Sequence, residues 1–241
     1  MLTDLGTLPG GTSSCGAGVN TRGVVVGLST DGSLDPLTGF PAIHAVRWRD
    51  GKIQDLGTLG GNESYASFIN DRGQITGAAL NAIPDSFTTQ LFIGATQVHA
   101  FLWDNESMHD LGTLGGANSI GWYINQRGEI AGQSFKDDIP NETTGIPTIG
   151  SFLWRNGKML DLGSLGGTWG TPNALNNVGQ VVGTSDLEGD EIFHPFLWER
   201  GSITDLGTLG GSGVPGSICA SGGETNWKVP GRPFGSMRGV R

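Results

Sequence analysis

The stretch HAFLWDNESMHDLGTLGG, residues 99–116, carries two motifs that recur along the whole chain, one at each end. Its first part predicts a β-hairpin: residues 99–103 form one strand, the polar residues 104–107 form the turn, and residues 108–111 return. At residues 150–162 the same segment has Asn-Gly in its turn, which is a strong local signal for two antiparallel strands.

The second of these motifs, Asp-Leu-Gly-(Thr/Ser)-Leu-(Gly/Pro)-Gly, occurs five times, at intervals of 51, 55, 51 and 44 residues. It begins at Asp4, Asp55, Asp110, Asp161 and Asp205. Another motif, Asn-x-x-Gly-x-(Ile/Val)-x-Gly, predicts a further hairpin, because Asn and Gly adopt positive φ in turns at little cost. It begins at Asn20, Asn70, Asn125 and Asn176. Four short strands in each tandem unit of about 50 residues are typical of a β-propeller blade.

The spacing between motifs separates constant from variable parts of each unit. Eleven residues always lead from the start of the His-Ala-Phe segment to the next Asp-Leu-Gly, whereas 18 to 29 lead from the Asn to the His-Ala-Phe segment. This variation predicts surface loops at residues 28–43, 78–98, 133–149 and 184–193. We therefore expect an all-β, β-propeller-like array of four-stranded antiparallel blades, with four to five repeats of 44–55 residues. It would form either a small closed ring or part of a larger propeller.

Composition agrees with this fold class. Glycine accounts for 43 of the 241 residues, and a glycine in a helix interior costs about 1 kcal/mol relative to alanine, so a helix-rich fold is disfavoured. With 36% apolar and only 15% charged residues, the chain also lacks the composition of a disordered protein.

Charge and motifs exclude several function classes. The net charge of −9 disfavours nucleic-acid binding, because an acidic surface repels phosphate. No stretch approaches the roughly 20 apolar residues of a membrane span, and the first residues do not form a signal peptide. Cys15 and Cys219 have the spacing of neither a zinc site nor a redox pair. No catalytic, phosphate-binding or metal motif occurs, so the sequence assigns no catalytic, cofactor-binding or metal-binding residues and no cofactor.

Repeated apolar residues and glycines have expected structural roles. The tryptophan of one strand and the leucine of Asp-Leu-Gly should pack between neighbouring blades. These are Trp48, Trp103, Trp154 and Trp198, and Leu56, Leu111, Leu162 and Leu206. Glycine pairs should let the chain cross between blades, where unusual φ and ψ are needed. They begin at Gly60, Gly115, Gly166 and Gly210.

In these motifs the chain closely resembles the HAF family of extracellular repeat proteins, named after the His-Ala-Phe signature found here at residues 99–101. The resemblance covers about residues 1–212. It implies a bacterial protein that is secreted or exposed at the cell surface, and it brings no established catalytic residues. The sequence departs from the family pattern at residues 46–47 (Val-Arg), at residues 150–151 (Gly-Ser) and at Pro195.

The motifs delimit a tandem β-repeat domain at residues 1–212 and a divergent tail at residues 213–241. From residue 221 onward the tail has four basic residues and one acid, and this shift in composition predicts disorder. The repeats start in mid-unit and stop one motif into a fifth unit, which would suit part of a larger propeller and would explain the missing signal peptide.

Two repeated polar positions could be functional, but a structural role is favoured for each. Gly150 interrupts the set of repeated histidines, so hydrogen bonding is favoured over metal binding for them. The histidines are His44, His99 and His194. The Asp of each Asp-Leu-Gly motif is expected to accept backbone N–H groups in a turn.

Charged loops are expected to be solvated. Arg22, Arg72 and Arg127 occupy one position of the Asn motif, which is Val178 in the fourth unit. The acidic loop at residues 186–191 lacks the pattern of a calcium site.

For function, we expect a non-catalytic extracellular scaffold for binding, adhesion or interaction, with a glycan or a protein as its ligand. The alternative is a propeller enzyme that hydrolyses or cleaves polysaccharide with acids from the variable loops. The scaffold is favoured because the units are alike, whereas a catalytic site needs an asymmetric cluster of titratable groups. The longest variable loop is expected either to cover a neighbouring blade or to form a wall of the binding surface. Its apolar residues are Phe87, Leu91, Phe92 and Ile93.

Overall fold

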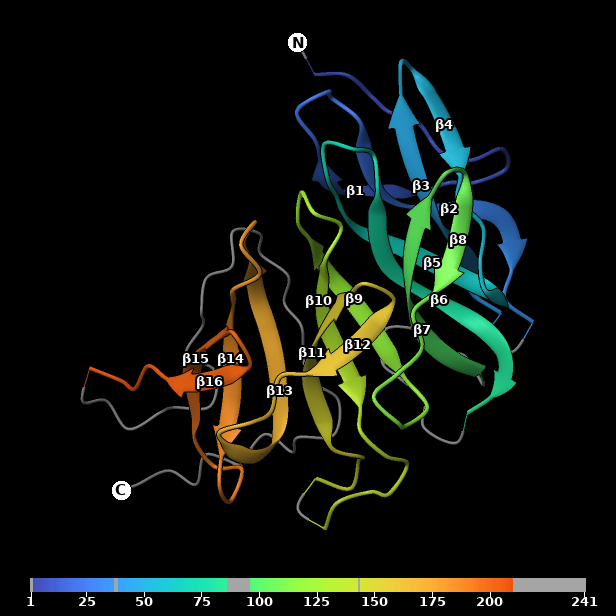
Figure 1. The fold of residues 1–241 in the computed structure, drawn as a ribbon. Coiled ribbons are helices and arrows are strands. Elements are labelled where there is room, and N and C mark those ends of the chain that lie inside the picture. Colours follow the sequence, from blue (N-terminus) through green and yellow to red (C-terminus); the bar gives the residue numbers. More distant parts are fainter. Residues whose placement is uncertain (1, 37–38, 86–95, 143, 210–241) are drawn as a thin grey trace, which may run out of the picture.

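The computed structural model describes residues 2–36, 39–85, 96–142 and 144–209. These residues form sixteen strands and no helix (Figure 1). The described part of the chain therefore has no helix that could cross a membrane. The expected all-β class is confirmed.

Each repeat unit forms a four-stranded antiparallel sheet whose strands pair in chain order. The first unit contains β1 (Ser14–Val19), β2 (Val25–Leu34), β3 (Pro41–Arg49) and β4 (Lys52–Asp55). The second contains β5 (Gly60–Ile69), β6 (Ile75–Pro84), β7 (Thr96–Asp104) and β8 (Ser107–Asp110). The third contains β9 (Ser119–Ile124), β10 (Ile130–Phe135), β11 (Ile149–Arg155) and β12 (Lys158–Asp161). The fourth contains β13 (Gly166–Leu175), β14 (Val181–Leu187), β15 (Phe193–Glu199) and β16 (Ser202–Asp205).

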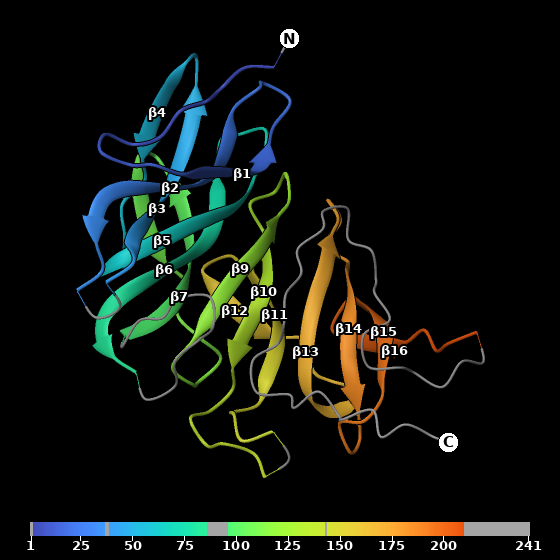
Figure 2. The same cartoon turned by 180° about the vertical axis from the view of Figure 1, so that it is seen from behind.

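The four units lie side by side in chain order (Figures 1 and 2). The first strand of each later unit packs on the middle strands of the unit before it: β5 on β2 and β3, β9 on β6 and β7, and β13 on β10 and β11. A single parallel pairing of Ile149 with Trp169 also joins the third and fourth sheets. Among the described residues no sheet closes on itself, and no strand pairing links the first unit with the fourth.

Every unit has a β-bulge at the same place in its first strand. In β5 the pairing with β6 passes from Ala66–Gly77 to Phe68–Thr76, and the register shifts at equivalent points of β1, β9 and β13. A Cβ on Gly77 would lie 2.0 Å from the carbonyl oxygen of Tyr65 and 2.9 Å from the Phe101 ring. The Asn motif therefore ends in glycine, because the bulge and the buried phenylalanine leave no room for a side chain.

The glycine pairs lie at the crossings between units, as the sequence predicts. Gly60, Gly115 and Gly166 have φ of 108°, 141° and 117°, which an L-residue with a side chain rarely adopts. The fourth pair, at residues 210–211, lies outside the described residues.

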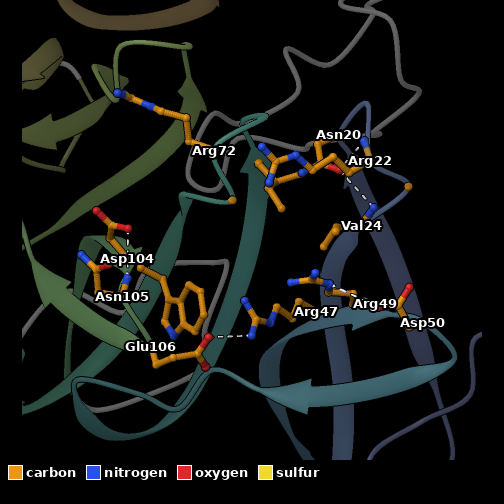
Figure 3. A pocket seen from close by; sticks show the side chains of 14 residues that line it. Asn20, Arg22, Val24, Arg47, Arg49, Asp50, Arg72, Asp104, Asn105 and Glu106 are labelled. Atoms are coloured by element: carbon orange, nitrogen blue, oxygen red, sulfur yellow. Dashed lines mark hydrogen bonds and ion pairs between the residues drawn. The ribbon is translucent and has the colours of Figure 1, made fainter.

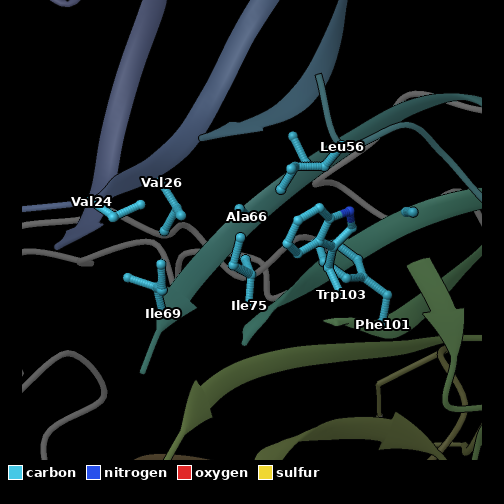
Figure 4. Packing of buried hydrophobic residues seen from close by; sticks show 10 residues of the cluster. Val24, Val26, Leu56, Ala66, Ile69, Ile75, Phe101 and Trp103 are labelled. Atoms are coloured by element: carbon cyan, nitrogen blue, oxygen red, sulfur yellow. The ribbon is translucent and has the colours of Figure 1, made fainter. Parts of the chain in front are cut away.

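Apolar side chains of neighbouring units meet at three joints. In the first joint, Val26 and Leu56 of the first unit pack with Ile69, Ile75 and Trp103 of the second (Figure 4). Trp154 and Leu111 lie together in the second joint, and Trp198 and Leu162 in the third. The predicted packing of these residues between units is confirmed.

Two residues depart from this pattern because each lies at an end of the described array. Leu206 is 54% exposed, since no described unit follows the fourth, so the prediction that it is packed between blades was wrong. Trp48 has no described unit before it and packs instead on Leu8 of its own chain. Its Nε1 donates to the carbonyl oxygen of Gly6 at 3.3 Å.

The Asn turns of the four units are connected by a row of side-chain hydrogen bonds, which we call the Asn ladder. The Oδ1 of Asn70 accepts the N–H groups of Arg72 and Gln74 in its own turn, both at 3.0 Å. Its Nδ2 donates to the carbonyl oxygen of Asn125 in the next unit, also at 3.0 Å. Asn20 donates to Asn70, and Asn125 to Asn176, in the same way.

The next residue of each turn forms a parallel row of bonds. The N–H of Thr21 donates to the Asp71 carboxylate, the N–H of Asp71 to the Gln126 side chain, and the N–H of Gln126 to the Asn177 side chain. All these bonds cross a joint with the same polarity, from one unit to the next.

The variable connections are partly strand, which corrects the prediction of loops. β2 continues to Leu34 and β6 to Pro84, and their partners β3 and β7 begin at Pro41 and Thr96. Middle strands have neighbours on both edges, so their pairing extends beyond the constant motifs. Both the apolar residues 87 and 91–93 and the predicted tail at residues 213–241 lie outside the described residues.

We expect the substitution Trp103→Ala to destabilise the protein by roughly 3–5 kcal/mol, the cost of removing a buried aromatic side chain. Trp103 is only 3% exposed, whereas Trp154 is half-buried, so Trp154→Ala should cost less. Urea unfolding of both variants measures the difference. Equal midpoints for Trp103→Ala and the parent would contradict the joint packing described here.

The substitution Asn70→Ala should cost about 2–4 kcal/mol, because it leaves the N–H groups of Arg72 and Gln74 without partners and removes one hydrogen bond to the carbonyl of Asn125. Asn176→Ala is the matched control: Asn176 makes the same bonds within its own turn, but it is exposed and its Nδ2 donates only to Gln180. Urea unfolding compares the two. Equal losses of stability would show that the bonds between units contribute nothing.

Candidate functional site

The repeated histidines form hydrogen bonds with the aspartates of the Asp-Leu-Gly motifs. The Nδ1 of His44 donates to Asp55 at 2.8 Å, and the pairs His99–Asp110 and His194–Asp205 have the same geometry at 2.8 and 2.9 Å. In each motif the Asp Oδ1 also accepts the N–H of the glycine two residues later. The structural roles predicted for both residue types are confirmed.

In the third unit a lysine replaces the missing histidine. Gly150 stands at the histidine position, and the Nζ of Lys136, which directly follows β10, lies 2.7 Å from Asp161 Oδ2. A Cβ on Gly150 would be 2.5 Å from the Lys136 Cε, so the lysine fills the space of the absent imidazole. The aspartate therefore keeps a hydrogen-bonding partner without the histidine.

In the first unit a second carboxylate approaches the histidine. The Nε2 of His44 lies 3.7 Å from Asp31 Oδ2. The hydrogen bond to Asp55 raises the pKa of His44 despite its burial, and the charges of Asp55 and Asp31 act in the same direction. Burial by itself would raise the pKa of Asp55, but the hydrogen bonds from His44 and Gly57 outweigh it and lower that pKa.

The pKa of Glu63, on β5, is shifted in the opposite direction to that of Asp55. Burial, reinforced by the negative charge of Asp35, raises the pKa of Glu63 to about 7, and the nearby His44 lowers it only in part. Asp35 is 2% exposed and accepts a hydrogen bond from the Nδ2 of Asn62. We call Asp35, His44 and Glu63 the carboxylate cluster. In the part of the chain that the structure describes, no group of three or more His, Cys, Asp or Glu residues is arranged to hold a metal ion.

A surface pocket of about 310 Å³ lies at the joint between the first and second units (Figure 3). It is bordered by the first two Asn turns and by the β3–β4 and β7–β8 turns. Four arginines line it: Arg22, Arg47, Arg49 and Arg72. We call this site the arginine pocket.

Two of the four arginines are already paired with acids. Arg47 lies 2.7 Å from Glu106 Oε1, and its guanidinium lies over the Trp103 ring at 4.6 Å. Arg49 lies 3.3 Å from Asp50 at the protein surface. Arg22 and Arg72 are exposed, and among the described residues neither forms an ion pair. The pocket therefore has cationic groups available to an anion.

The Arg47–Glu106 pair occurs at this joint and not at the other two. Leu102, Leu153 and Leu197 occupy the position of Arg47 in the other units. Glu106 occupies a turn position that is Gly51, Gly157 and Gly201 in the other units, and its φ is 61°. A left-handed conformation of a residue with a side chain costs about 1–2 kcal/mol, and such strain is concentrated at functional sites.

No pattern in the sequence indicated that these arginines lie together. Arg22 and Arg72 were expected to be solvated turn residues, and they are exposed, but the joint places both on one pocket, whereas Arg127 does not line it. The departure from the repeat pattern at Val46-Arg47 was the only local signal.

The acidic loop is only partly solvated, which corrects its prediction. Glu188 and Glu191 are exposed, but Asp186 is 1% exposed. Asp190 accepts hydrogen bonds from the N–H and the hydroxyl of Thr168. Asp190 thus stabilises the strand crossing, and Asp186 is buried instead of facing solvent.

A comparison with protein-family models finds none that matches this chain, and no curated protein sequence matches it either. The resemblance to HAF repeats therefore rests on the motifs themselves.

We expect Glu63→Gln to stabilise the protein at pH 8 and to have little effect at pH 4.5. The pKa of Glu63 is about 7 in the folded protein against 4.5 ordinarily. The native state therefore loses stability as the pH rises from 4.5 through 7, where Glu63 ionises more readily in the unfolded chain. Thermal unfolding from pH 4.5 to 8 measures the effect. Glu188→Gln, at an exposed glutamate, is the control, and an equal response of both variants would refute the shift.

Proposed function

We propose that this protein is a non-catalytic binding scaffold built from propeller-type blades, with the arginine pocket as its recognition site for an anionic ligand. Support for blades comes from the repeated four-stranded sheets, from the bulge in each first strand and from the Asn ladder that aligns successive units. Variable connections between constant hairpins suit recognition without chemistry.

The observation that carries the proposal is the strained ion pair at the first joint. Glu106 adopts φ of 61° at a position where the other units have glycine, and it holds both Arg47 and Gln54 through its two oxygens at 2.7 Å. These bonds hold the Arg47 guanidinium over the Trp103 ring. A plain structural joint does not need this arrangement, because the second and third joints lack it.

The chemistry of the pocket favours carboxylates as ligands. A guanidinium presents a planar set of donors that matches a carboxylate, and charge-assisted bonds are about twice as strong as neutral ones. The protein as a whole carries −9, so general attraction to anions is weak and recognition depends on the local cluster. The ligand class that we propose is an acidic polysaccharide bearing uronate carboxylates, encountered outside the cell as the HAF resemblance implies.

An enzyme that cleaves polysaccharide is the second candidate, and the carboxylate cluster is the observation that favours it. A carboxyl group with a pKa near 7 can act as a general acid at neutral pH. Glu63 has this property, and Asp35 is a second carboxylate beside it. Glu63 and Asp35 do not line the arginine pocket, so the two candidate functions can be tested separately.

We expect Arg72→Ala to weaken binding of polygalacturonate fragments by about 10-fold, which corresponds to the loss of one charge-assisted interaction. Isothermal titration calorimetry at low salt measures it. Arg127→Ala is the matched control, because Arg127 occupies the same turn position one unit further on and does not line the pocket. Raising the salt concentration should weaken binding by the parent protein.

Three outcomes would contradict the proposal. Equal losses for Arg72→Ala and Arg127→Ala would place binding elsewhere, and equal affinity for neutral dextran would exclude recognition of carboxylates. Release of reducing ends from the polysaccharide, abolished by Glu63→Gln, would establish the enzyme instead.

A further inference from the structure

The two ends of the repeat array present the two halves of a joint that occurs three times inside it. Each internal joint brings a downstream face of one unit onto the upstream face of the next. In the first joint the downstream face includes Val26 and the upstream face includes Ile69 and Ile75. These definitions allow the outer faces of the first and fourth units to be compared with the internal ones.

The fourth unit has an uncovered downstream face. Val182 is 40% exposed, although the equivalent residues Val26, Thr76 and Ala131 are all fully buried. Leu197 pairs with Val182 across β14 and β15 and is half-buried, as Leu102 is in the second unit, whereas Leu153 is fully buried in the third joint. The apolar pair that is covered in the third unit is thus open in the fourth.

The first unit has an uncovered upstream face. Val19, at the end of β1, is 64% exposed, while its equivalents Ile69 and Ile124 are 3% and 4% exposed. Val25 is half-buried, whereas Ile75 and Ile130, its counterparts, are fully buried. This face has the residue types that the downstream face of a preceding unit covers at each internal joint.

The hydrogen-bond rows end with matching polarity at these two faces. In every joint the Asn Nδ2 of the upstream unit donates to the Asn carbonyl of the downstream unit. The last unit offers the Nδ2 of the exposed Asn176, which now bonds only to Gln180 in its own turn. The first unit offers the carbonyl of Asn20. Donor and acceptor face each other only if the fourth unit meets a first unit, head to tail.

We infer that a second copy of this chain docks head to tail, with the fourth unit of each copy against the first unit of the other. The contact continues the repeat joint, so its apolar pairs and its Asn ladder are those already present three times in the chain. Head-to-tail contacts form either closed rings or open chains. Two copies supply eight units, which lies within the range of about four to eight blades that propellers use. This inference is independent of the ligand proposed for the arginine pocket.

On the first unit, the chain's own N-terminal segment already supplies one of the apolar contacts of a joint. In the first internal joint, Leu59 of the connecting segment packs beside Trp103. On the first unit Leu8 of the chain's own N-terminal segment is buried against Trp48 in the same manner. The partner therefore contributes the face of β14 and β15 together with its exposed Leu206, which corresponds to Leu56 in the first joint. The place of its Leu209 is already taken by Leu8.

Sedimentation equilibrium of the full chain over micromolar concentrations tests this inference. The expected mass is twice the 25.1 kDa of one chain. Val19→Asp and Val182→Asp should each give a species of one chain with unchanged circular dichroism, because a charge in the joint has no partner. Ile139→Asp is the control, since Ile139 is 74% exposed on a connection of the third unit, away from both faces.

Mixing the two variants distinguishes a head-to-tail contact from a symmetric one. Val19→Asp retains an intact fourth unit and Val182→Asp an intact first unit, so an equimolar mixture should regain a two-chain species through one joint. Single chains at all concentrations would overturn the inference, as would dimers that persist in either variant. Recovery of dimers only after removal of residues 210–241 would show that the chain covers its own face. Species larger than two chains would overturn the closed ring.

Discussion

A buried asparagine in each unit can be satisfied only if the next unit stands beside it, and the arrangement of the molecule depends on this constraint. Asn70 is 1% exposed. Its Oδ1 accepts two N–H groups of its own turn. Its Nδ2 donates to the side chain of Gln74 and to the carbonyl of Asn125 in the following unit. Leaving such a group unpaired costs about 1–3 kcal/mol, so the amide fixes where the neighbouring turn must lie. Apolar packing at the joints adds most of the stabilisation but is not directional, and the Asn ladder supplies the register.

Where the units differ in sequence, a different residue supplies the polar group at the equivalent place. Ser64 Oγ accepts the N–H of Ala45 across the first joint and donates to Gly57, and Ser119 does the same at the second. At the third joint the serine is replaced by Gly170, and a Cβ there would lie 3.3 Å from the hydroxyl of Ser151, which stands in place of the alanine. The hydroxyl thus lies on the other side of the joint, but the Ser151 Oγ forms no hydrogen bond with the described residues, so the interaction is lost at this joint. The exchange of histidine for Lys136 beside Asp161, by contrast, retains a hydrogen bond to the aspartate.

The first joint differs from the other two in having a charged pair where they have apolar residues and glycine. Arg47 and Glu106 both replace residues that are apolar or glycine elsewhere, and Glu106 accepts a strained backbone conformation to form the pair. A leucine over Trp103, as in the other joints, would stabilise the contact without strain or exposed charge. The Arg47–Glu106 pair departs from the repeat, and two further repeat arginines, Arg22 and Arg72, line the same pocket, which is why we propose that this joint recognises anions.

Much of the fold could be predicted from the sequence, because it depends on local rules. Turn residues, glycine positions and constant motif spacing predicted two hairpins in each unit, and the pattern of Trp103 and Leu56 predicted the joints. The strand content of the variable connections could not be predicted in this way. Strands such as β2 and β6 extend as far as the strands on both sides continue to pair with them. The roles of His44 and Asp55 were predictable because they lie at a fixed spacing on paired strands. The arginine pocket and the shifted pKa of Glu63 were not, because their residues belong to different units, and only the packing of one unit on the next brings those charges together.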